Sequence, residues 1–362
     1  MKDIKNLTPS LSSRLDHITP DTELQDSQYS KILQSKATNQ LTKTSSKKGA
    51  TIDPIAGYAT LNTSGDITVF LNNYKELKLD TPTHKLLDAL TIVFTQNVTD
   101  KKHLNESDLD QQRTITLSID DYMSLCGLKD KKEAKKQLKK ATDTLFNIAL
   151  EWEETIKYVP EGKRRAKTEQ VHIRLRVCDK LAEFKRGGNL VFSFSYDLAK
   201  YLAKTTGYIM PYPNKLFTLS AKYNPNSYYM GRRIVEHHNM NIAKNNATTI
   251  AVKTLLDATP ELPSYEDVMR GNKNIYDRII APFERDLTAL VDAGVLESWE
   301  YCNSKKAPLT QDQRNGLSYE IFSELYISFK LADYPNQEQR IRKIENRQAR
   351  AKAKEEKQRK EA

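Results

Sequence analysis

The sequence has few cysteines and no long apolar run. Only three of its 362 residues are cysteines, and Cys126, Cys178 and Cys302 lie far apart. This number and spacing fit neither a disulfide framework nor a cysteine-based metal site, so a reducing compartment is expected. No apolar run approaches the roughly 18 residues of a membrane span, and the first fifty residues lack the apolar core of a signal peptide. We therefore expect a cytoplasmic protein with no membrane partner.

The signatures of common nucleotide-processing enzymes are also missing. No glycine cluster is followed by Lys-Ser or Lys-Thr, the pattern that holds a nucleotide phosphate. A rolling-circle initiator needs a His-hydrophobic-His metal site beside a nucleophilic tyrosine, but His237 and His238 are adjacent and His172 has no second histidine two residues later. Tyr196 and Lys200 have a Tyr-xxx-Lys spacing, which without that metal site is more typical of a core helix. We expect no catalytic residue, no metal site and no cofactor.

Positive charge is in excess. The chain has 57 Lys and Arg against 47 Asp and Glu, a net charge of +10 and a pI of about 9.2. Such a balance favours a polyanionic partner. The length allows two domains of ordinary size, each with its own core, plus tails.

The most informative segment is a helix with lysines on one side. One face of it carries an apolar stripe at helical spacing, formed by Ala134, Leu138, Ala141, Leu145 and Ile148. The opposite face carries a lysine group that consists of Lys132, Lys136 and Lys139, flanked by Lys135 and Lys140. Like charges at this spacing repel each other, and Glu133 is the only acidic residue among these lysines that offsets the repulsion. The pattern predicts contact with DNA phosphates; the alternative is a surface helix that is lysine-rich for solubility.

The neighbouring segments predict a winged helix around this lysine helix. A strand at 114–119 and a short helix at 122–125 precede it, and Gly127 makes the turn between the helices. Alternating runs at 155–159 and 171–177 follow as a hairpin, which we interpret as the wing. Its tip carries Lys163, Arg164 and Arg165, which are suited to lie along a DNA backbone. The alternative is a mobile, soluble loop.

A second hairpin is expected after the predicted wing. Gly187 and Gly188 form its turn between residues 184 and 194, and Ser195 then caps a helix.

The C-terminal half repeats the plan. We expect helices at 226–240, 249–256 and 274–293. A strand that begins at Trp299 is expected to pair with a second strand at 319–329. The exposed face of the third helix offers Asn274, Arg278 and Arg285, groups whose shapes suit adenine and guanine edges. Pro282 either kinks this helix or lies in its first turn, which would shorten the reading face. The alternative for this face is a solvated surface with ordinary ion pairs.

These observations predict an α+β protein with two tandem winged-helix domains. Its five expected parts are a mostly disordered tail at 1–50, a first winged-helix domain at 51–204, an interdomain linker at 205–214, a second winged-helix domain at 215–332 and a basic helical tail at 333–362. Within the first domain we also expect a strand at 67–71, a helix at 83–94 and a loop at 99–112.

Three stretches resemble the plasmid replication initiators that bind iterons, the repeated origin sequences. The first winged helix of that family resembles residues 115–150 (ITLSIDDYMSLCGLKDKKEAKKQLKKATDTLFNIAL), and its strand-to-helix passage resembles residues 189–203 (NLVFSFSYDLAKYLA). The second winged helix of related initiators is similar to residues 274–301 (NIYDRIIAPFERDLTALVDAGVLESWEY). The resemblance covers roughly residues 65–332.

The resemblance implies a DNA-binding protein that is not an enzyme. Initiators of this family bind origin repeats in duplex DNA through both winged helices, help to melt adjacent DNA and bring in the host initiator and replicative helicase. Their dimers typically repress their own promoter, so a homodimer is a possible form of this chain. The competing interpretation is a winged-helix transcriptional repressor without replication activity. Two unlike winged helices in one chain favour the initiator, since a repressor more often dimerises a single one.

Overall fold

The computed structural model describes most of the chain between residues 28 and 335. The described residues are 28–45, 50–53, 57–61, 67–99, 106–158, 167–184, 189–204, 209–271, 274–310, 313 and 317–335. They fall into two compact units, the first including Ser30–Met210 and the second Tyr29 and the chain from Pro211 onward. The division lies inside segment 205–214, where a linker was predicted. Residues 205–208 lie outside the described part, and the rest of that segment contributes strand β10 (Ile209–Pro213).

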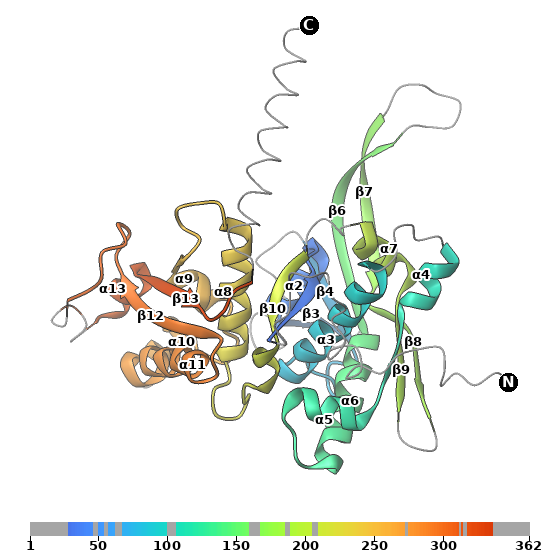
Figure 1. Cartoon of the computed structure of the whole chain (residues 1–362), viewed down its shortest axis with the longest axis horizontal. Helices are drawn as coiled ribbons and strands as arrows, with labels where there is room; N and C mark the ends of the chain where they lie inside the picture. The colour runs from blue at the N-terminus through green and yellow to red at the C-terminus, as the bar shows by residue number, and fades with distance from the viewer. Residues whose placement is uncertain are drawn as a thin grey trace, which may run out of the picture. The chain divides into compact units, whose positions relative to one another are not determined.

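The first unit contains helices, a five-stranded sheet and a three-stranded sheet (Figure 1). Its elements in chain order are β1 (Tyr29–Leu33), α2 (Lys36–Lys43), β2 (Ala50–Asp53), β3 (Tyr58–Leu61), β4 (Thr68–Asn72), α3 (Thr81–Thr99), α4 (Glu106–Gln112), β5 (Thr114–Leu117), α5 (Ile119–Cys126), α6 (Lys131–Phe146), β6 (Ile148–Tyr158), β7 (Lys167–Arg176), β8 (Cys178–Glu183), β9 (Leu190–Phe194) and α7 (Tyr196–Lys204). One sheet has the order β2-β3-β4-β6-β7 and the other the order β5-β9-β8, and β1 pairs with β10.

The smaller sheet and three helices make a winged helix. In chain order these elements are α3, β5, α5, α6, β8 and β9, and the first strand lies beside the last in the sheet. Helix α6 contacts α3, α5 and β8. Left-handed Gly127 (φ 63°) ends α5 and turns the chain toward α6, as predicted. The predicted fold of two winged helices is confirmed in this first unit.

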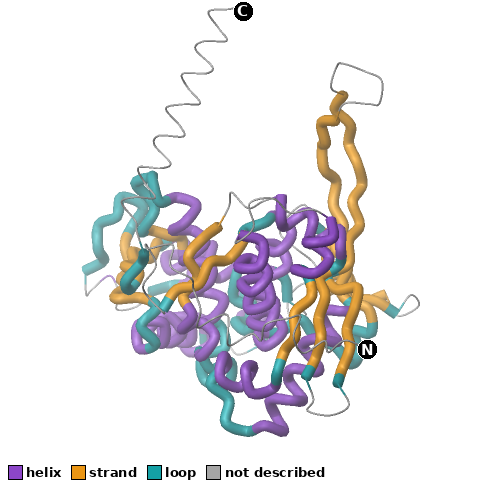
Figure 2. Tube along the Cα trace, turned by 45° about the vertical axis from the view of Figure 1, so that its right-hand side comes forward, coloured by secondary structure: helices purple, strands orange, loops and turns teal. Residues whose placement is uncertain are grey.

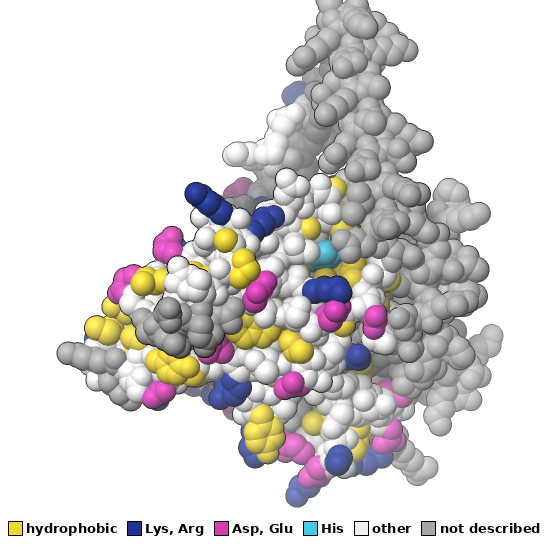
Figure 3. Space-filling model, turned by 60° about the vertical axis from the view of Figure 1, so that its left-hand side comes forward, with side chains coloured by type: hydrophobic (Ala, Val, Ile, Leu, Met, Phe, Trp, Pro, Cys, Tyr) yellow, Lys and Arg dark blue, Asp and Glu magenta, His cyan; other side chains and the backbone are white. Residues whose placement is uncertain are grey.

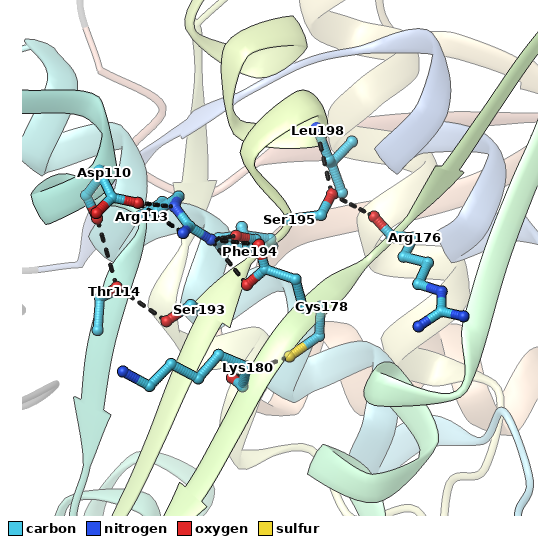
Figure 4. A network of polar contacts seen from close by, with 11 residues as sticks. Asp110, Arg113, Thr114, Arg176, Cys178, Lys180, Ser193, Phe194, Ser195 and Leu198 are labelled. Carbon is cyan, nitrogen blue, oxygen red and sulfur yellow. Dashed lines mark hydrogen bonds and ion pairs between the residues drawn. The ribbon is translucent and has the colours of Figure 1, made fainter. Parts of the chain in front are cut away.

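The guanidinium of Arg113 connects helix α4 with strands β8 and β9 of this sheet (Figure 4). Arg113, just before β5, donates to the Asp110 carboxylate of α4 from Nε (2.8 Å) and Nη2 (2.6 Å). Its Nη1 donates to both carboxylate oxygens of Asp179 in β8 and to the Phe194 carbonyl at the end of β9 (2.8, 2.7 and 2.6 Å). Ser195 caps α7 as predicted, since its Oγ accepts from the Leu198 amide (3.3 Å).

The hairpin that we predicted to be the wing belongs to the other sheet. Strands β6 and β7 pair antiparallel over ten residue pairs, from Ala149↔Arg176 to Tyr158↔Lys167. They extend as a long ribbon past the helices (Figure 2). Because β6 also pairs with β4, the ribbon is an extension of the five-stranded sheet. The strand order instead gives the wing's place to the β8–β9 hairpin, the second hairpin expected from the sequence.

Part of the segment predicted to be disordered is folded. Within 1–50, residues 29–43 form β1 and α2, and Ile32, Leu33 and Leu41 are buried. The Leu33 amide donates to Thr95 Oγ1 of α3 (2.9 Å). Burial of these apolar side chains offsets the conformational entropy lost on ordering the segment. Residues 1–27 lie outside the described part of the chain.

The second unit repeats the winged-helix order. Its elements are η2 (Asn214–Thr218), α8 (Ser227–Asn241), β11 (Thr249–Ala251), α9 (Val252–Asp257), α10 (Tyr265–Arg270), η3 (Tyr276–Ile280), α11 (Ala281–Asp292), β12 (Leu296–Cys302), α13 (Tyr319–Glu324) and β13 (Tyr326–Leu331). The sheet order is β11-β13-β12, again with the first strand beside the last. The sequence of helix, strand, helices and two strands confirms a second winged helix.

Three predicted segments differ from these elements. The expected helix at 249–256 begins as strand β11, the expected strand at 319–329 begins as helix α13, and the expected loop at 99–112 ends in helix α4. All three elements are short, and β11 is set by its pairing with β13 over only three residues. Local periodicity is weak evidence over so few residues.

A buried carboxylate joins the helices of the second unit. Asp286 of α11 is fully buried and accepts from both the amide N–H (3.1 Å) and Nδ2 (3.0 Å) of Asn226, the residue that starts α8. Asn226 Oδ1 in turn accepts from the Glu261 amide (2.9 Å) in the connection before α10. This chain of hydrogen bonds fixes α11 relative to α8 and to the turn that precedes it.

We predict that Asp286→Ala destabilises the second unit by about 1–3 kcal/mol, because it leaves two buried donors of Asn226 without an acceptor. Asp286→Asn is the matched control. Burial raises the pKa of Asp286, since the charged form is poorly solvated there, and asparagine removes the charge while keeping one acceptor oxygen. Its effect should be much smaller. Urea unfolding followed by Trp299 fluorescence in a Trp152→Phe background measures both variants, and equal losses of stability would contradict the prediction.

Candidate nucleic-acid interface

Helix α6 is built as the sequence predicts. Asp130 caps it, with Oδ1 accepting from the amides of Lys132 (2.8 Å) and Glu133 (3.3 Å). The residues that share the buried face are Ala134, Leu138, Ala141 and Leu145, each at most 2% exposed. Ile148, the last member of the predicted stripe, is buried as well but belongs to β6. The packing of this face fixes which side of α6 meets solvent.

The three residues of the predicted lysine group and the two lysines that flank it are all exposed. Lys132, Lys135, Lys136, Lys139 and Lys140 lie on the solvent side of α6. They are not equivalent, because Lys135 and Lys139 have Nζ atoms 3.6 and 3.8 Å from the carboxylate of Glu183 in β8. Within the described part of the chain, the other three have no carboxylate within ion-pair distance. The structure therefore brings the predicted cations together on one surface.

The strands of the β6–β7 ribbon are not a basic face. Arg174 of β7 forms an ion pair with Glu151 of β6, and His172 Nδ1 lies 2.8 Å from Glu153 Oε1. The cross-strand Glu151 thus offsets the positive charge of Arg174. The predicted tip residues Lys163, Arg164 and Arg165 lie outside the described residues. Their contact with DNA stays a prediction.

The helix predicted at 274–293 passes through Pro282 without ending. Tyr276–Ile280 is a π-type turn, in which the Ala281 amide donates to the Tyr276 carbonyl, and it leads directly into α11. Pro282 then lies in the first turn of α11, where its missing N–H is not needed. The helical segment upstream of the proline is kept, so Arg278 remains on it. The π-type turn also alters the spacing that an uninterrupted α-helix would give.

The three predicted base-reading residues of the second unit are all exposed, but they differ in their contacts. Asn274 donates from Nδ2 to the Asp277 carboxylate and accepts from the Asp277 amide at Oδ1 (3.2 Å), so its carboxamide caps the start of the helix. Arg285 Nη2 lies 3.8 Å from Asp286 Oδ1. Among the described residues, the side chain of Arg278 has no hydrogen bond or ion pair. Arg278 and Arg285 are thus better placed than Asn274 to meet a ligand.

The surface charge of the second unit is balanced. Residues 215–332 contain 14 Lys and Arg and 14 Asp and Glu. Figure 3 brings this unit forward and shows cations and carboxylates interspersed over the face it draws. Charge alone therefore provides little attraction for a polyanion here.

The histidines considered for a metal site have structural contacts. The ring nitrogens His237 Nε2 and His238 Nδ1 lie 3.0 and 3.1 Å from the carbonyl oxygens of Asn246 and Ala247. The described residues contain no group of three or more His, Cys, Asp or Glu that could hold a metal ion. No helix in the same part of the chain is long and apolar enough to cross a membrane.

Comparisons with known proteins agree with the fold. Residues 71–224 match the family described as Initiator Replication protein, WH1, a match that covers less than half of the 362 residues. No curated protein matches the chain.

Two solved structures are loosely similar to the chain. The Pi initiator protein in complex with iteron DNA is 14% identical with a TM-score of 0.42, over 70% of this chain and 91% of that one. Domains 2 and 3 of RctB are 14% identical with a TM-score of 0.37, over 82% of this chain and 98% of that one. Both TM-scores are low, so these likenesses add no argument about function.

The fold defines a protein with two winged-helix units, the first of which carries a lysine-faced helix. Residues 71–224 match the first winged-helix region of the replication initiator proteins, the kind of protein that the sequence resembles. The family predicted from the sequence is confirmed.

We predict that Lys132→Gln, Lys136→Gln and Lys140→Gln together flatten the salt dependence of duplex DNA binding. The slope of log K against log salt should fall by about 0.9 for each phosphate that the variant no longer neutralises. Fluorescence anisotropy over a salt series measures it. Lys131→Gln is the matched control, because Lys131 Nζ is already paired with Asp120 (2.7 Å). An unchanged slope in the triple variant would remove α6 from the interface.

We further expect Arg278→Ala and Arg285→Ala each to weaken binding to a preferred site by about 1–3 kcal/mol, the value of a bidentate base contact. Binding to random duplex DNA should change much less. The preferred site is obtained by selection from a random-sequence pool, and both DNAs are titrated at one salt concentration. Equal weakening on the two DNAs would make these arginines backbone contacts.

Proposed function

We propose that the protein is a sequence-specific, double-stranded DNA-binding replication initiator. In this proposal it recognises origin repeats of a plasmid or mobile element and recruits the host replication machinery. The observation that carries the proposal is the match of residues 71–224 to the initiator family, over a winged helix whose α6 exposes five lysines on one side.

The lysine face and the two arginines have different roles in this proposal. Phosphate contacts from lysines give affinity without sequence information, whereas contacts to base edges give specificity. Helix α6 and the tip residues 163–165 supply the first kind of contact. Arg278 and Arg285 supply the second kind, because arginine binds guanine O6 and N7 in a bidentate geometry. Asn274 joins them only if DNA displaces its capping bonds with Asp277.

Two winged helices on one chain account for recognition of an origin. A single module covers too few base pairs to select one site in a genome, since each mismatch is worth only about 1–3 kcal/mol. Once one module is bound, the second acts at a high effective concentration. The initiators that the sequence resembles bind repeated origin sites, and residues 71–224 match the initiator family. Repeated duplex sites are therefore the proposed target here.

The remaining parts of the proposal concern partners and location. The protein acts in the cytoplasm, where it brings the host initiator and replicative helicase to the origin. A homodimer is the proposed form that represses the protein's own promoter. No catalytic step by this chain is included, because the initiator opens DNA by binding and leaves the enzymatic work to its partners.

The proposal predicts replication that depends on both the gene and its repeats. A plasmid lacking any other origin should be maintained when it carries the gene and the repeats that the protein selects in vitro. It should be lost when Arg278 and Arg285 are both replaced by Ala, and retained with the control Lys131→Gln. If the protein binds its selected site and represses a promoter there, yet the plasmid is lost with the unaltered gene, the repressor function would replace the initiator function.

A further inference from the structure

Glu183 places a carboxylate next to the exposed lysines of α6, and the packing of the fold does not require it there. Glu183 is the last residue of β8, paired with Leu190 at the end of the β8–β9 hairpin. Strand β8 lies beside α6 (Figure 1). The Glu183 carboxylate points two oxygens at the lysines, with Oε1 3.6 Å from Lys135 Nζ and Oε2 3.8 Å from Lys139 Nζ. The side chains are between 40% and 60% exposed, so this contact contributes little to stability.

This contact divides the cations of α6 into two groups. Lys135 and Lys139 are one helical turn apart and share the Glu183 carboxylate, which cancels part of their charge. Asp143, one turn further along, adds to this acidic side: burial raises its pKa, the nearby Lys139 lowers it and Glu183 raises it. In the described part of the chain, Lys132, Lys136 and Lys140 have no such partner. Only the second group is fully available to phosphates.

We propose that Glu183 is a specificity-determining residue, which holds Lys135 and Lys139 against β8 and so keeps them out of nonspecific phosphate contacts. This inference rests on the proposed DNA binding by α6. On random DNA the protein binds through charge in many registers, so every additional mobile cation strengthens binding. On the preferred site, base contacts fix the register, and the two lysines stay with Glu183. Removing the carboxylate should therefore strengthen random binding more than specific binding.

The central test is Glu183→Gln in the full chain, with binding to a random duplex and to the selected site measured over a salt series. On the random duplex the slope should steepen by about 0.9 for each lysine released, and the affinity at physiological salt should rise about fivefold per lysine. Affinity for the selected site should change less, so the ratio of specific to random binding falls. Circular dichroism and the Tm report whether folding is unchanged.

Two control variants separate the contact from the net charge. Glu133→Gln makes the same charge change on α6, at an exposed residue that has no ion pair among the described residues, and should raise binding to both DNAs by a similar small factor. Glu183→Asp keeps the charge but withdraws the carboxylate by one methylene, and should change the random-DNA slope in the same direction as Glu183→Gln. The aspartate variant also gives an answer if the glutamine variant fails to fold.

A double-mutant cycle gives the decisive outcome. In a Lys135→Gln, Lys139→Gln background, Glu183→Gln should no longer change the salt slope. The inference is overturned if the effect persists there, if Glu133→Gln reproduces it, or if Glu183→Gln weakens the selected site in preference to random DNA. The proposed function fails in a different way: no duplex sequence is then selected by the unaltered protein.

Discussion

The winged helix of the first unit depends on burying one face of α6. Leu138 and Leu145 are essentially inaccessible to solvent, and burying each such side chain is worth about 1.5–3 kcal/mol. Repulsion between like charges one turn apart costs only about 0.2–0.5 kcal/mol per pair. Packing therefore sets the rotation of the helix, and the lysines face outward together as a consequence. The crowding of charge is tolerated because the fold does not depend on relieving it.

Elements with local signals could be predicted from the sequence. The turn at Gly127 and the apolar stripe of α6 both lie within a few residues of the structure they determine. The pairing of β6 with β7 was equally readable, because both runs alternate. Its place in the molecule was not, since membership of a sheet depends on a distant strand: Ala149 pairs with Phe70, far away in the chain. The wing was assigned to the wrong hairpin for this reason.

Polar contacts across the sequence were harder still to predict. The sequence carries no local signal for Arg113, whose partners come from α4, β8 and β9, or for the buried Asp286. It predicted correctly that the lysines of α6 would be exposed, but not that two of them would share Glu183. The spacing of the lysines predicts which side of the helix they lie on. The carboxylate that pairs with a lysine depends on which strand packs beside the helix. The same limit applies to Asn274. Its carboxamide was expected to contact base edges, but in the structure it caps the start of its own helix.

The two units differ in how they can hold DNA under the proposed function. Balanced charge on residues 215–332 means that the second unit gains little from counterion release, the main source of nonspecific affinity. Contacts to base edges must then carry most of its contribution. The first unit has the opposite character, because the three lysines of α6 with no carboxylate partner among the described residues, Lys132, Lys136 and Lys140, attract phosphates of any sequence. Since the units are linked, the first can keep the second close to DNA while the second discriminates among sites, a division that neither unit could achieve alone.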